Sequence, residues 1–218
     1  MKNLKPKRVT LFAGHYGSGK TNIAVNYALH LAKSGYPVTI ADLDIVNPYF
    51  RTKDSAEALE QAGIRLISSA YANSNVDVPA LPAELYALTQ DKSRYAILDV
   101  GGDDRGALAL GRYAADILEE QNYEMIFVAN FYRPLTTTAE EALAVMKEIE
   151  TAGNIPFTAI VHNSNLGRET TPSDVTDKEK EAEKLSALSG LPLLFTAAEA
   201  SVAETLDAFP LDLQKKIF

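Results

Sequence analysis

Cysteine is absent from the 218 residues of the sequence. Disulfide bonds, thiolate metal ligands, iron–sulfur clusters and cysteine nucleophiles are therefore excluded. Long apolar runs are missing as well: the longest have the length of a strand, whereas a membrane-spanning helix needs about 20 apolar residues. The basic start of the chain is followed by only a short apolar run, residues 9–13, which is too short for a signal peptide. We therefore expect a cytoplasmic protein without stable membrane association.

Basic residues are outnumbered, with 21 Lys and Arg against 29 Asp and Glu and a formal net charge of −8. Binding to nucleic acids or to anionic lipids relies on clustered Lys and Arg. We therefore expect no nucleic-acid partner. The hydrophobic fraction of 46% is that of an ordinary folded domain.

Short apolar runs alternate with longer amphipathic stretches, which predicts a mostly parallel sheet with helices on both faces. Runs dense in Val, Ile, Leu and Phe predict strands at 9–13, 38–41, 64–67, 96–100, 125–129, 157–161 and 193–195. The stretches between them predict helices at 21–34, 54–62, 82–90, 105–120, 138–152 and 174–189. Thr138 and Glu141 form a capping-box pattern. No linker divides the chain, so we predict one domain over residues 1–218, an α/β fold built as a three-layer α/β/α sandwich.

A phosphate-loop pattern follows the first predicted strand, since residues 14–21 read Gly-His-Tyr-Gly-Ser-Gly-Lys-Thr. The glycines let backbone N–H groups point toward phosphates, and the following helix adds the positive end of its dipole. Lys20 supplies a charge for the β- and γ-phosphates, and Thr21 supplies a hydroxyl for Mg²⁺. The pattern predicts a P-loop NTPase fold. The predicted nucleotide-binding residues of the loop are Gly14, His15, Tyr16, Gly17, Ser18, Gly19, Lys20 and Thr21.

Aspartates at the ends of two other predicted strands are candidates for the metal site. Asp42 and Asp44 follow the second strand, and Asp99 closes the fourth. Such carboxylates can face Mg²⁺, which prefers carboxylate and water oxygens. Gly102 could offer a backbone N–H to the γ-phosphate. For the pair Asp42 and Asp44, turn formation after a strand is the alternative.

Together these segments resemble the deviant phosphate-loop ATPases of the SIMIBI class, which include MinD, ParA and the CobQ/CobB-type nucleotide-binding domains. The resemblance lies in residues 14–21, in Asp-Leu-Asp-Ile-Val-Asn-Pro-Tyr-Phe-Arg at 42–51 and in Asp-Val-Gly-Gly-Asp-Asp at 99–104. It is closest to a bacterial ATP-binding branch of that superfamily. The resemblance implies that Lys20 binds phosphates and that Thr21 ligates Mg²⁺ with Asp42 and Asp99 in support. It also implies that Asp44 positions the hydrolytic water.

One position departs from the MinD-like and ParA-like pattern. Those ATPases have a lysine at the second loop position, where it reaches the phosphates of a partner subunit, whereas this sequence has His15. Histidine is shorter and mostly neutral near pH 7, so it cannot be assumed to take over that role. Arg51 and Arg105, which follow the two metal-site segments, are possible substitutes, with a solvated surface charge as the alternative for each.

The loop after the sixth predicted strand indicates adenine as the base. Guanine is usually recognised by a carboxylate in an Asn-Lys-x-Asp tetrapeptide, whereas residues 163–166 read Asn-Ser-Asn-Leu. An asparagine amide can accept from the adenine amino group and donate to a ring nitrogen. Related ATPases contact adenine with an asparagine here. We therefore predict that Asn163 contacts adenine; the alternative is that Asn163 and Asn165 stabilise a turn.

These observations predict a Mg²⁺-dependent ATP-binding protein, a slow ATPase that acts as a nucleotide-dependent switch on itself or on a partner protein. The expected partners are a second copy in a nucleotide-dependent homodimer, or a protein client. Two alternatives stay open. One is a nucleotide sensor that does not hydrolyse ATP, which His15 favours. The other is a small-molecule kinase or ligase whose acceptor is held by residues 68–81.

Overall fold

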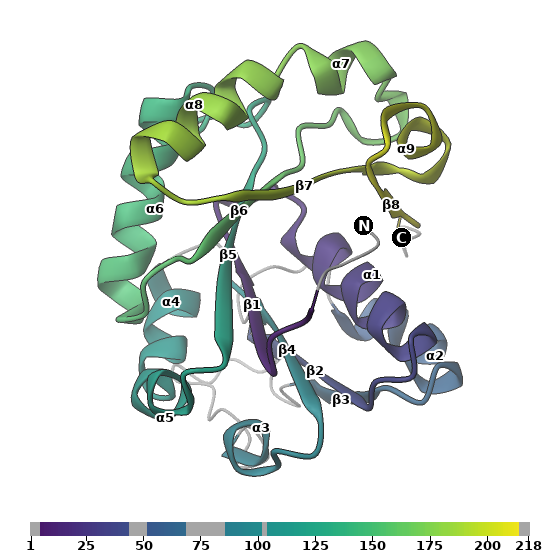
Figure 1. The fold of residues 1–218 in the computed structure, drawn as a ribbon, viewed down its shortest axis with the longest axis vertical. Helices are drawn as coiled ribbons and strands as arrows, with labels where there is room; N and C mark the ends of the chain where they lie inside the picture. Colours follow the sequence, from purple (N-terminus) through teal and green to yellow (C-terminus); the bar gives the residue numbers. More distant parts are fainter. Residues whose placement is uncertain (1–4, 44–51, 69–85, 102–103, 214–218) are drawn as a thin grey trace, which may run out of the picture.

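The computed structural model of the chain describes residues 5–43, 52–68, 86–101 and 104–213. Within these residues the centre of the fold is an eight-stranded parallel sheet with the order β3-β2-β4-β1-β5-β6-β7-β8 (Figure 1). Its strands are β1 (Val9–Ala13), β2 (Val38–Leu43), β3 (Arg65–Ser68), β4 (Tyr95–Val100), β5 (Tyr123–Ala129), β6 (Ala159–His162), β7 (Leu193–Glu199) and β8 (Phe209–Leu211). Because all strands run the same way, the segments that follow β1, β2, β4, β5 and β6 gather at one edge of the sheet.

Helices cover both faces of the sheet and complete three layers. On one face lie α1 (Lys20–Lys33) and α2 (Ala56–Gln61), which follows the 3₁₀ turn η1 (Thr52–Ser55). The other face carries α3 (Tyr86–Gln90), α4 (Asp104–Gly111), α5 (Ala114–Glu120), α6 (Ala139–Gly153) and α8 (Glu179–Ser189) (Figure 1). A smaller cluster beside β7 joins α7 (Pro172–Thr176) to α9 (Ala200–Leu206), and the 3₁₀ turn η3 (Gly167–Glu169) precedes α7. The predicted three-layer α/β/α sandwich is confirmed.

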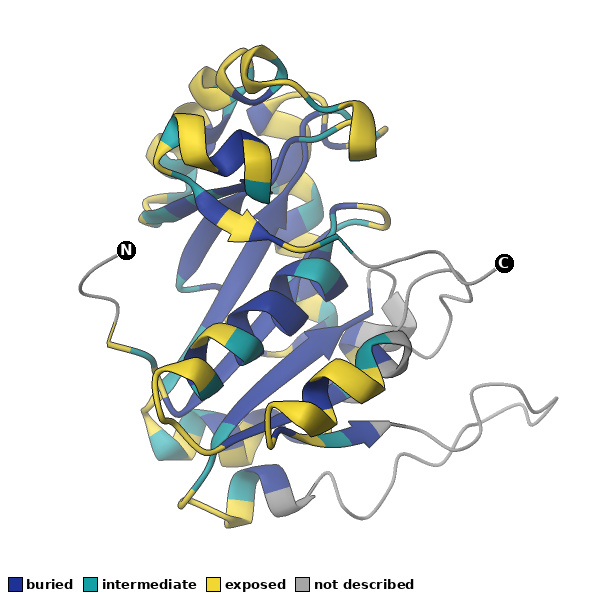
Figure 2. Ribbon diagram, turned by 90° about the vertical axis from the view of Figure 1, so that its right-hand side faces the viewer, coloured by how far each residue is buried: buried dark blue, intermediate teal, exposed yellow. Residues whose placement is uncertain are grey.

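The inner strands are buried on both faces, which explains why they read as continuous apolar runs (Figure 2). In β1, Leu11 packs into the core under α4, α5 and α6, while Phe12 packs into the core under α1. The Phe12 ring meets the Tyr27 ring edge-on at 5.4 Å between centroids. The residues that flank the sheet edge are thus held on a rigid base.

Two predicted helices each break into two, and the reason lies in what each half buries. The predicted helix 105–120 ends as α4 at Gly111 and restarts as α5, with Tyr113 buried between them and its N–H bonded to the Leu110 carbonyl. The predicted helix 174–189 splits into α7, which packs toward α9, and α8, which packs on the main core. No single straight helix could serve both directions.

Two elements at the end of the chain were not predicted. The strand β8 is only three residues long and has Pro210 at its centre, a residue typical of edge strands because it has no N–H to donate. The helix α9 is short and is capped by Glu199, whose carboxylate accepts from the Ser201 N–H. The predicted capping box at the start of α6 is confirmed, with both bonds between Thr138 and Glu141 present.

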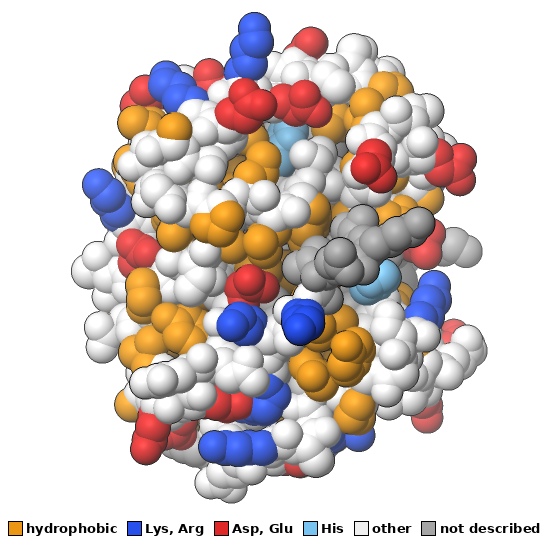
Figure 3. Space-filling view, viewed as in Figure 1, with side chains coloured by type: hydrophobic (Ala, Val, Ile, Leu, Met, Phe, Trp, Pro, Cys, Tyr) orange, Lys and Arg blue, Asp and Glu red, His pale blue; other side chains and the backbone are white. Residues whose placement is uncertain are grey.

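The outer surface mixes charges of both signs. On the face shown in Figure 3, Lys and Arg side chains are scattered among Asp and Glu side chains and do not gather into one patch. None of the helices in the described segments has the length and apolar character needed to cross a bilayer.

Candidate functional site

The loop at 14–19 joins β1 to α1 at the edge where the strands end. A Cβ atom on Gly14 would lie 2.5 Å from the Val128 carbonyl oxygen of β5, so only glycine permits this approach of two backbones. Gly19 has φ of 92°, and a Cβ there would lie 2.3 Å from the Asn163 amide nitrogen. Glycine is therefore required at both positions, because the loop backbone lies against β5 and against Asn163 after β6.

The start of α1 has the features of an anion-binding site. No side chain caps the helix, and its first turn holds no acidic residue, which leaves the positive end of the dipole open. Lys20 is only 4% exposed, yet it forms no hydrogen bond or ion pair with the part of the chain that the structure describes. The buried Ser18 hydroxyl is likewise without a hydrogen-bond partner there. A lysine whose side chain is packed at a helix start, with no anion beside it in the described segments, suits a phosphate ligand.

Asp42 and Asp99 are brought together by the sheet. They are register partners on the neighbouring parallel strands β2 and β4, so both side chains leave the same face of the sheet. Thr52, which is fully buried, links them: its N–H donates to Asp42 Oδ2 at 3.2 Å, and its hydroxyl donates to Asp99 Oδ2 at 3.2 Å. Thr52 was not predicted, because a lone threonine ten residues after an aspartate has no recognisable pattern.

The residues present here fit Mg²⁺. The described segments contain no cluster of three or more His, Cys, Asp or Glu that could enclose a metal ion. Mg²⁺ does not need such a cage, since it keeps several waters and is held by one or two carboxylates together with the phosphates of its nucleotide. The pair Asp42 and Asp99, with the buried hydroxyl of Thr21 in the first turn of α1, is a donor set of that kind.

Asn163 follows β6 and contacts the loop at 14–19. Its amide nitrogen donates to the Ser18 carbonyl at 2.7 Å, and both groups are buried. Because a carbonyl oxygen only accepts, the nitrogen must be the atom that faces Ser18, and Oδ1 is left as an acceptor. Asn163 Oδ1 is buried and has no hydrogen-bond partner within the described residues. The structure thus gives Asn163 a role in shaping the loop, and its contact with adenine stays a prediction.

The segments after β5 and β6 are joined by a polar network that was also not predicted. Asn130 Oδ1 accepts from the Tyr132 N–H at 3.0 Å, and the Ser164 hydroxyl accepts from the Phe131 N–H at 3.0 Å. The Asn165 amide donates to the Asn163 carbonyl at 2.8 Å. Asn165 therefore stabilises the turn after β6, which is the role that the alternative hypothesis gave it.

Arg133 is a further residue that sequence reasoning missed. It lies in the segment between β5 and α6, and its Nε donates to the Gly17 carbonyl at 2.9 Å. A Cβ on Gly17 would lie 3.5 Å from the Arg133 Cδ and Nε, so the guanidinium lies directly against the phosphate loop. The only sequence signal was the position of this arginine shortly after a strand end, which many surface arginines share.

His15 is half-buried at the second position of the loop. Burial lowers the pKa of the imidazole below 6.5, and the neighbouring charge of Lys20 lowers this pKa further. The side chain is therefore neutral near pH 7 and adds no positive charge to the site.

Several predicted residues cannot be placed. Asp44, Arg51 and Gly102 lie outside the described residues, as do residues 69–81 of the segment predicted to hold an acceptor. Arg105 belongs to α4, but its side chain is not among those described.

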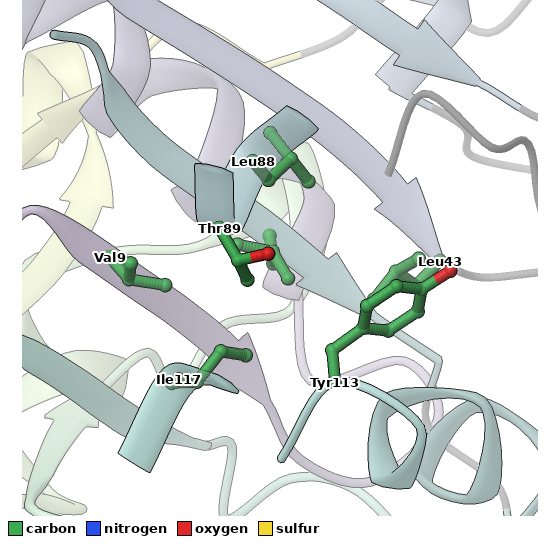
Figure 4. A pocket seen from close by; sticks show the side chains of 7 residues that line it. Val9, Leu43, Leu88, Thr89, Tyr113 and Ile117 are labelled. Atoms are coloured by element: carbon green, nitrogen blue, oxygen red, sulfur yellow. The ribbon is translucent and has the colours of Figure 1, made fainter. Parts of the chain in front are cut away.

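An apolar pocket lies away from the loop, between the sheet, α3 and α5 (Figure 4). Its lining residues are Val9, Leu43, Leu88, Thr89, Leu98, Tyr113 and Ile117. The lining carries no charged group, so this pocket is not suited to phosphate.

Fold and site together define a P-loop nucleotide-binding protein: a parallel sheet with a glycine loop after its first strand, an uncapped helix behind the loop and aspartates on adjacent strand ends. The family of CobQ/CobB/MinD/ParA nucleotide binding domains matches residues 9–170, and the chain belongs to that family. The predicted relationship to the SIMIBI-class P-loop proteins is thereby confirmed. A search of curated proteins gives no significant match.

Solved structures support the same fold. The cell division protein FtsY of Thermotoga maritima is 20% identical, with a TM-score of 0.64 over 96% of this chain and 67% of that protein. Chloroplast FtsY of Physcomitrella patens is 18% identical, with a TM-score of 0.63 over 96% and 63%. The signal recognition particle 54 kDa protein of Aeropyrum pernix, in complex with GDP, is 17% identical, with a TM-score of 0.56 over 92% and 43%. This chain therefore spans between 43% and 67% of those proteins' lengths, and likeness at such identities concerns the fold alone.

Proposed function

We propose that this protein binds ATP with Mg²⁺, hydrolyses it slowly, and uses the nucleotide state to switch contacts with a second copy or with a protein client. The observation that carries the proposal is the meeting of two carboxylates at the edge where the phosphate loop lies. Asp42 and Asp99 are register partners joined through Thr52. The buried Lys20 is the first residue of the helix that follows the loop.

In this proposal each residue has one task. Lys20 and the N–H groups at the start of α1 bind the β- and γ-phosphates. Thr21, Asp42 and Asp99 hold Mg²⁺, which when bound neutralises phosphate charge. Asp44 orients the attacking water, and the Gly102 N–H contacts the γ-phosphate. The rate gain comes from positioning and charge neutralisation without a covalent intermediate.

Two features favour adenine over guanine. Asn163 Oδ1 is an acceptor, which matches the exocyclic amino group of adenine and not the carbonyl of guanine at the same position. Leu166 occupies the place where a guanine-binding tetrapeptide has its carboxylate, and its side chain is largely exposed. Because one of the similar solved proteins is in complex with GDP, both nucleotides belong in the test.

A change of contacts with nucleotide state is proposed because Thr52 couples the metal-site carboxylates to η1 and α2. The Thr52 N–H and hydroxyl each bond one carboxylate, so a metal ion that reorients Asp42 or Asp99 also moves the start of η1. A nucleotide sensor without hydrolysis is a second candidate, which the neutral His15 favours, because the loop then lacks a charge for the transition state.

The test measures binding and turnover separately. Calorimetry with Mg²⁺-ATP, Mg²⁺-GTP and AMP should show tight binding of ATP, weaker binding of GTP and loss of binding without the outer phosphates. Phosphate release under single-turnover conditions then distinguishes the ATPase from the sensor. Light scattering with and without nucleotide reports self-association.

The matched variants are Lys20→Ala and Lys33→Ala, at the first and last positions of α1. Lys20→Ala should abolish most binding, whereas Lys33→Ala, an exposed lysine in the same helix, should retain it. Wild-type protein that binds neither ATP nor GTP would refute the proposed function.

A further inference from the structure

The segment between β5 and α6 presents one arginine to the phosphate loop in a fixed position. The Arg133 N–H and the Thr136 hydroxyl both donate to the Asn130 carbonyl, at 3.2 and 2.9 Å. The Thr136 N–H donates back to the Arg133 carbonyl at 3.2 Å. Thr136 is 1% exposed, so this turn is anchored in the interior. The backbone that carries the arginine is thus set before any ligand binds.

The side chain of Arg133 uses one of its donors to reach the loop. Nε donates to the Gly17 carbonyl, and the guanidinium carbon lies 4.0 Å from where a Cβ of Gly17 would be. The two terminal nitrogens form no hydrogen bond or ion pair with the segments that the structure describes. An arginine has five N–H donors, so four remain for a further acceptor.

The charges at the loop indicate which ligand the Arg133 guanidinium is suited to bind. A nucleoside triphosphate brings several negative charges, while the described residues of the loop and the first turn of α1 supply one side-chain charge, that of Lys20. Gly17 lies in the part of the loop before α1, so a guanidinium held there adds to Lys20 and to the helix N–H groups proposed to bind the β- and γ-phosphates. A planar guanidinium suits bidentate contact with phosphate oxygens.

We propose that Arg133 binds the terminal phosphates of a nucleoside triphosphate held by the same chain, with Nε on the Gly17 carbonyl and its terminal nitrogens on the phosphate oxygens. The inference rests on the proposed function and adds to it a residue that distinguishes triphosphate from diphosphate.

The test compares the dissociation constants of Mg²⁺-ATP and Mg²⁺-ADP for wild type, Arg133→Gln, Arg133→Met and Arg133→Lys. The two neutral variants should weaken ATP by about tenfold or more, as expected for the loss of charge-assisted hydrogen bonds, and ADP by less than about threefold. Arg133→Lys keeps the charge but loses the bidentate donors and the bond to Gly17, so its ATP affinity should lie between those of wild type and the neutral variants. Arg65→Gln is the matched control, because it removes an exposed arginine from the start of β3, at the opposite edge of the sheet.

The outcomes separate this inference from the proposed function. If wild type binds ATP but the neutral variants bind ATP and ADP as wild type does, or lose both equally, Arg133 only shapes the loop and the inference is overturned. If Arg65→Gln lowers ATP affinity as much as Arg133→Gln, the effect is nonspecific and the inference is again overturned. Wild type that binds no nucleotide refutes the proposed function itself.

Discussion

The two sides of the phosphate loop are held in different ways. On the side of β5 and β6, bonds run directly to the loop backbone: Asn163 to the Ser18 carbonyl and Arg133 to the Gly17 carbonyl, with Gly14 pressed against β5. On the side of β2 and β4, the contacts join two carboxylates to each other through Thr52. We call these the loop-anchoring side and the carboxylate side.

The difference teaches that the fixing of the loop and the candidate metal site are assigned to separate parts of the sheet. The loop-anchoring side uses the Asn163 amide, the Arg133 guanidinium and backbone contacts, which hold the loop without a nucleotide present. The carboxylate side brings two aspartates together through Thr52, a donor type that suits Mg²⁺. Apart from Arg133, we therefore expect changes on the first side to act mainly on stability and changes on the second to act mainly on metal-dependent binding.

The largest expected change in stability comes from a substitution of Gly19, on the loop-anchoring side. In Gly19→Ala the new methyl group would meet the Asn163 amide nitrogen at 2.3 Å, in a backbone with φ of 92°. Positive φ costs an alanine about 1 kcal/mol, and displacing Asn163 leaves the buried Ser18 carbonyl unsatisfied at about 1–3 kcal/mol. We expect about 3 kcal/mol less free energy of unfolding by urea denaturation.

Gly35→Ala isolates the backbone part of that effect. Gly35 has φ of 87° but nothing within 4 Å of its Cβ position, so only the cost of about 1 kcal/mol remains. Equal losses in the two variants would show that the contact between Asn163 and the loop contributes nothing.

A second prediction uses pH on the same side, through His162 at the end of β6. Burial lowers the pKa of His162 from 6.5 to about 4, and the ring Nδ1 lies 3.4 Å from the Thr196 hydroxyl. Below pH 6.5 His162 takes up a proton in the unfolded chain but not in the folded chain. The free energy of unfolding therefore has its full value above pH 6.5. It falls as the pH drops toward 4, by up to about 3 kcal/mol.

The measurement is the free energy of unfolding between pH 7 and pH 4. In His162→Gln, which does not titrate, the decline over this range should be smaller by that amount. The exposed His30→Gln is the control and should keep the wild-type decline. Parallel curves for wild type and His162→Gln would contradict the role of burial.

The fold was predictable because its signals are local. Strands such as β1 and β5, which are buried on both faces, appear as runs of apolar residues. The helix α6 begins at a capping box, which a four-residue sequence pattern defines. The breaks at Tyr113 and between α7 and α8 were not predictable, because they depend on which core each half meets. β8 was hidden by Pro210 and its short length.

For the site, what could be predicted were residues inside a motif, and what could not were their partners. Lys20, Thr21, Asp42 and Asp99 stand out because a glycine loop or a strand end marks them. Their roles remain predictions, although Asp42 and Asp99 are indeed adjacent. Thr52, Asn130 and Arg133 act through contacts between different segments, such as Arg133 and Gly17, whose positions differ by 116. Nothing in the local pattern distinguishes them from other polar residues.

The smallest expected changes in stability come from two buried threonines, one on each side. The Thr52 hydroxyl donates to the Asp99 carboxylate, and the Thr136 hydroxyl donates to the Asn130 carbonyl. In Thr→Val variants of similar shape, losing the bond to a charged acceptor should cost about 2 kcal/mol and losing the bond to a neutral one about 1 kcal/mol, by thermal or urea unfolding.

The nucleotide then separates the two variants. Thr52→Val removes a bond from Asp99, one of the carboxylates proposed to hold Mg²⁺, so it should shift the Mg²⁺ concentration needed for half-maximal ATP binding. Thr136→Val, which alters the turn that carries Arg133, should shift that concentration less, since its partner is a backbone carbonyl and not a residue proposed to hold Mg²⁺. Titrating Mg²⁺ at fixed ATP measures both. If the two variants respond alike, metal-dependent binding is not confined to the carboxylate side, and the division of the site between anchoring and metal binding does not hold.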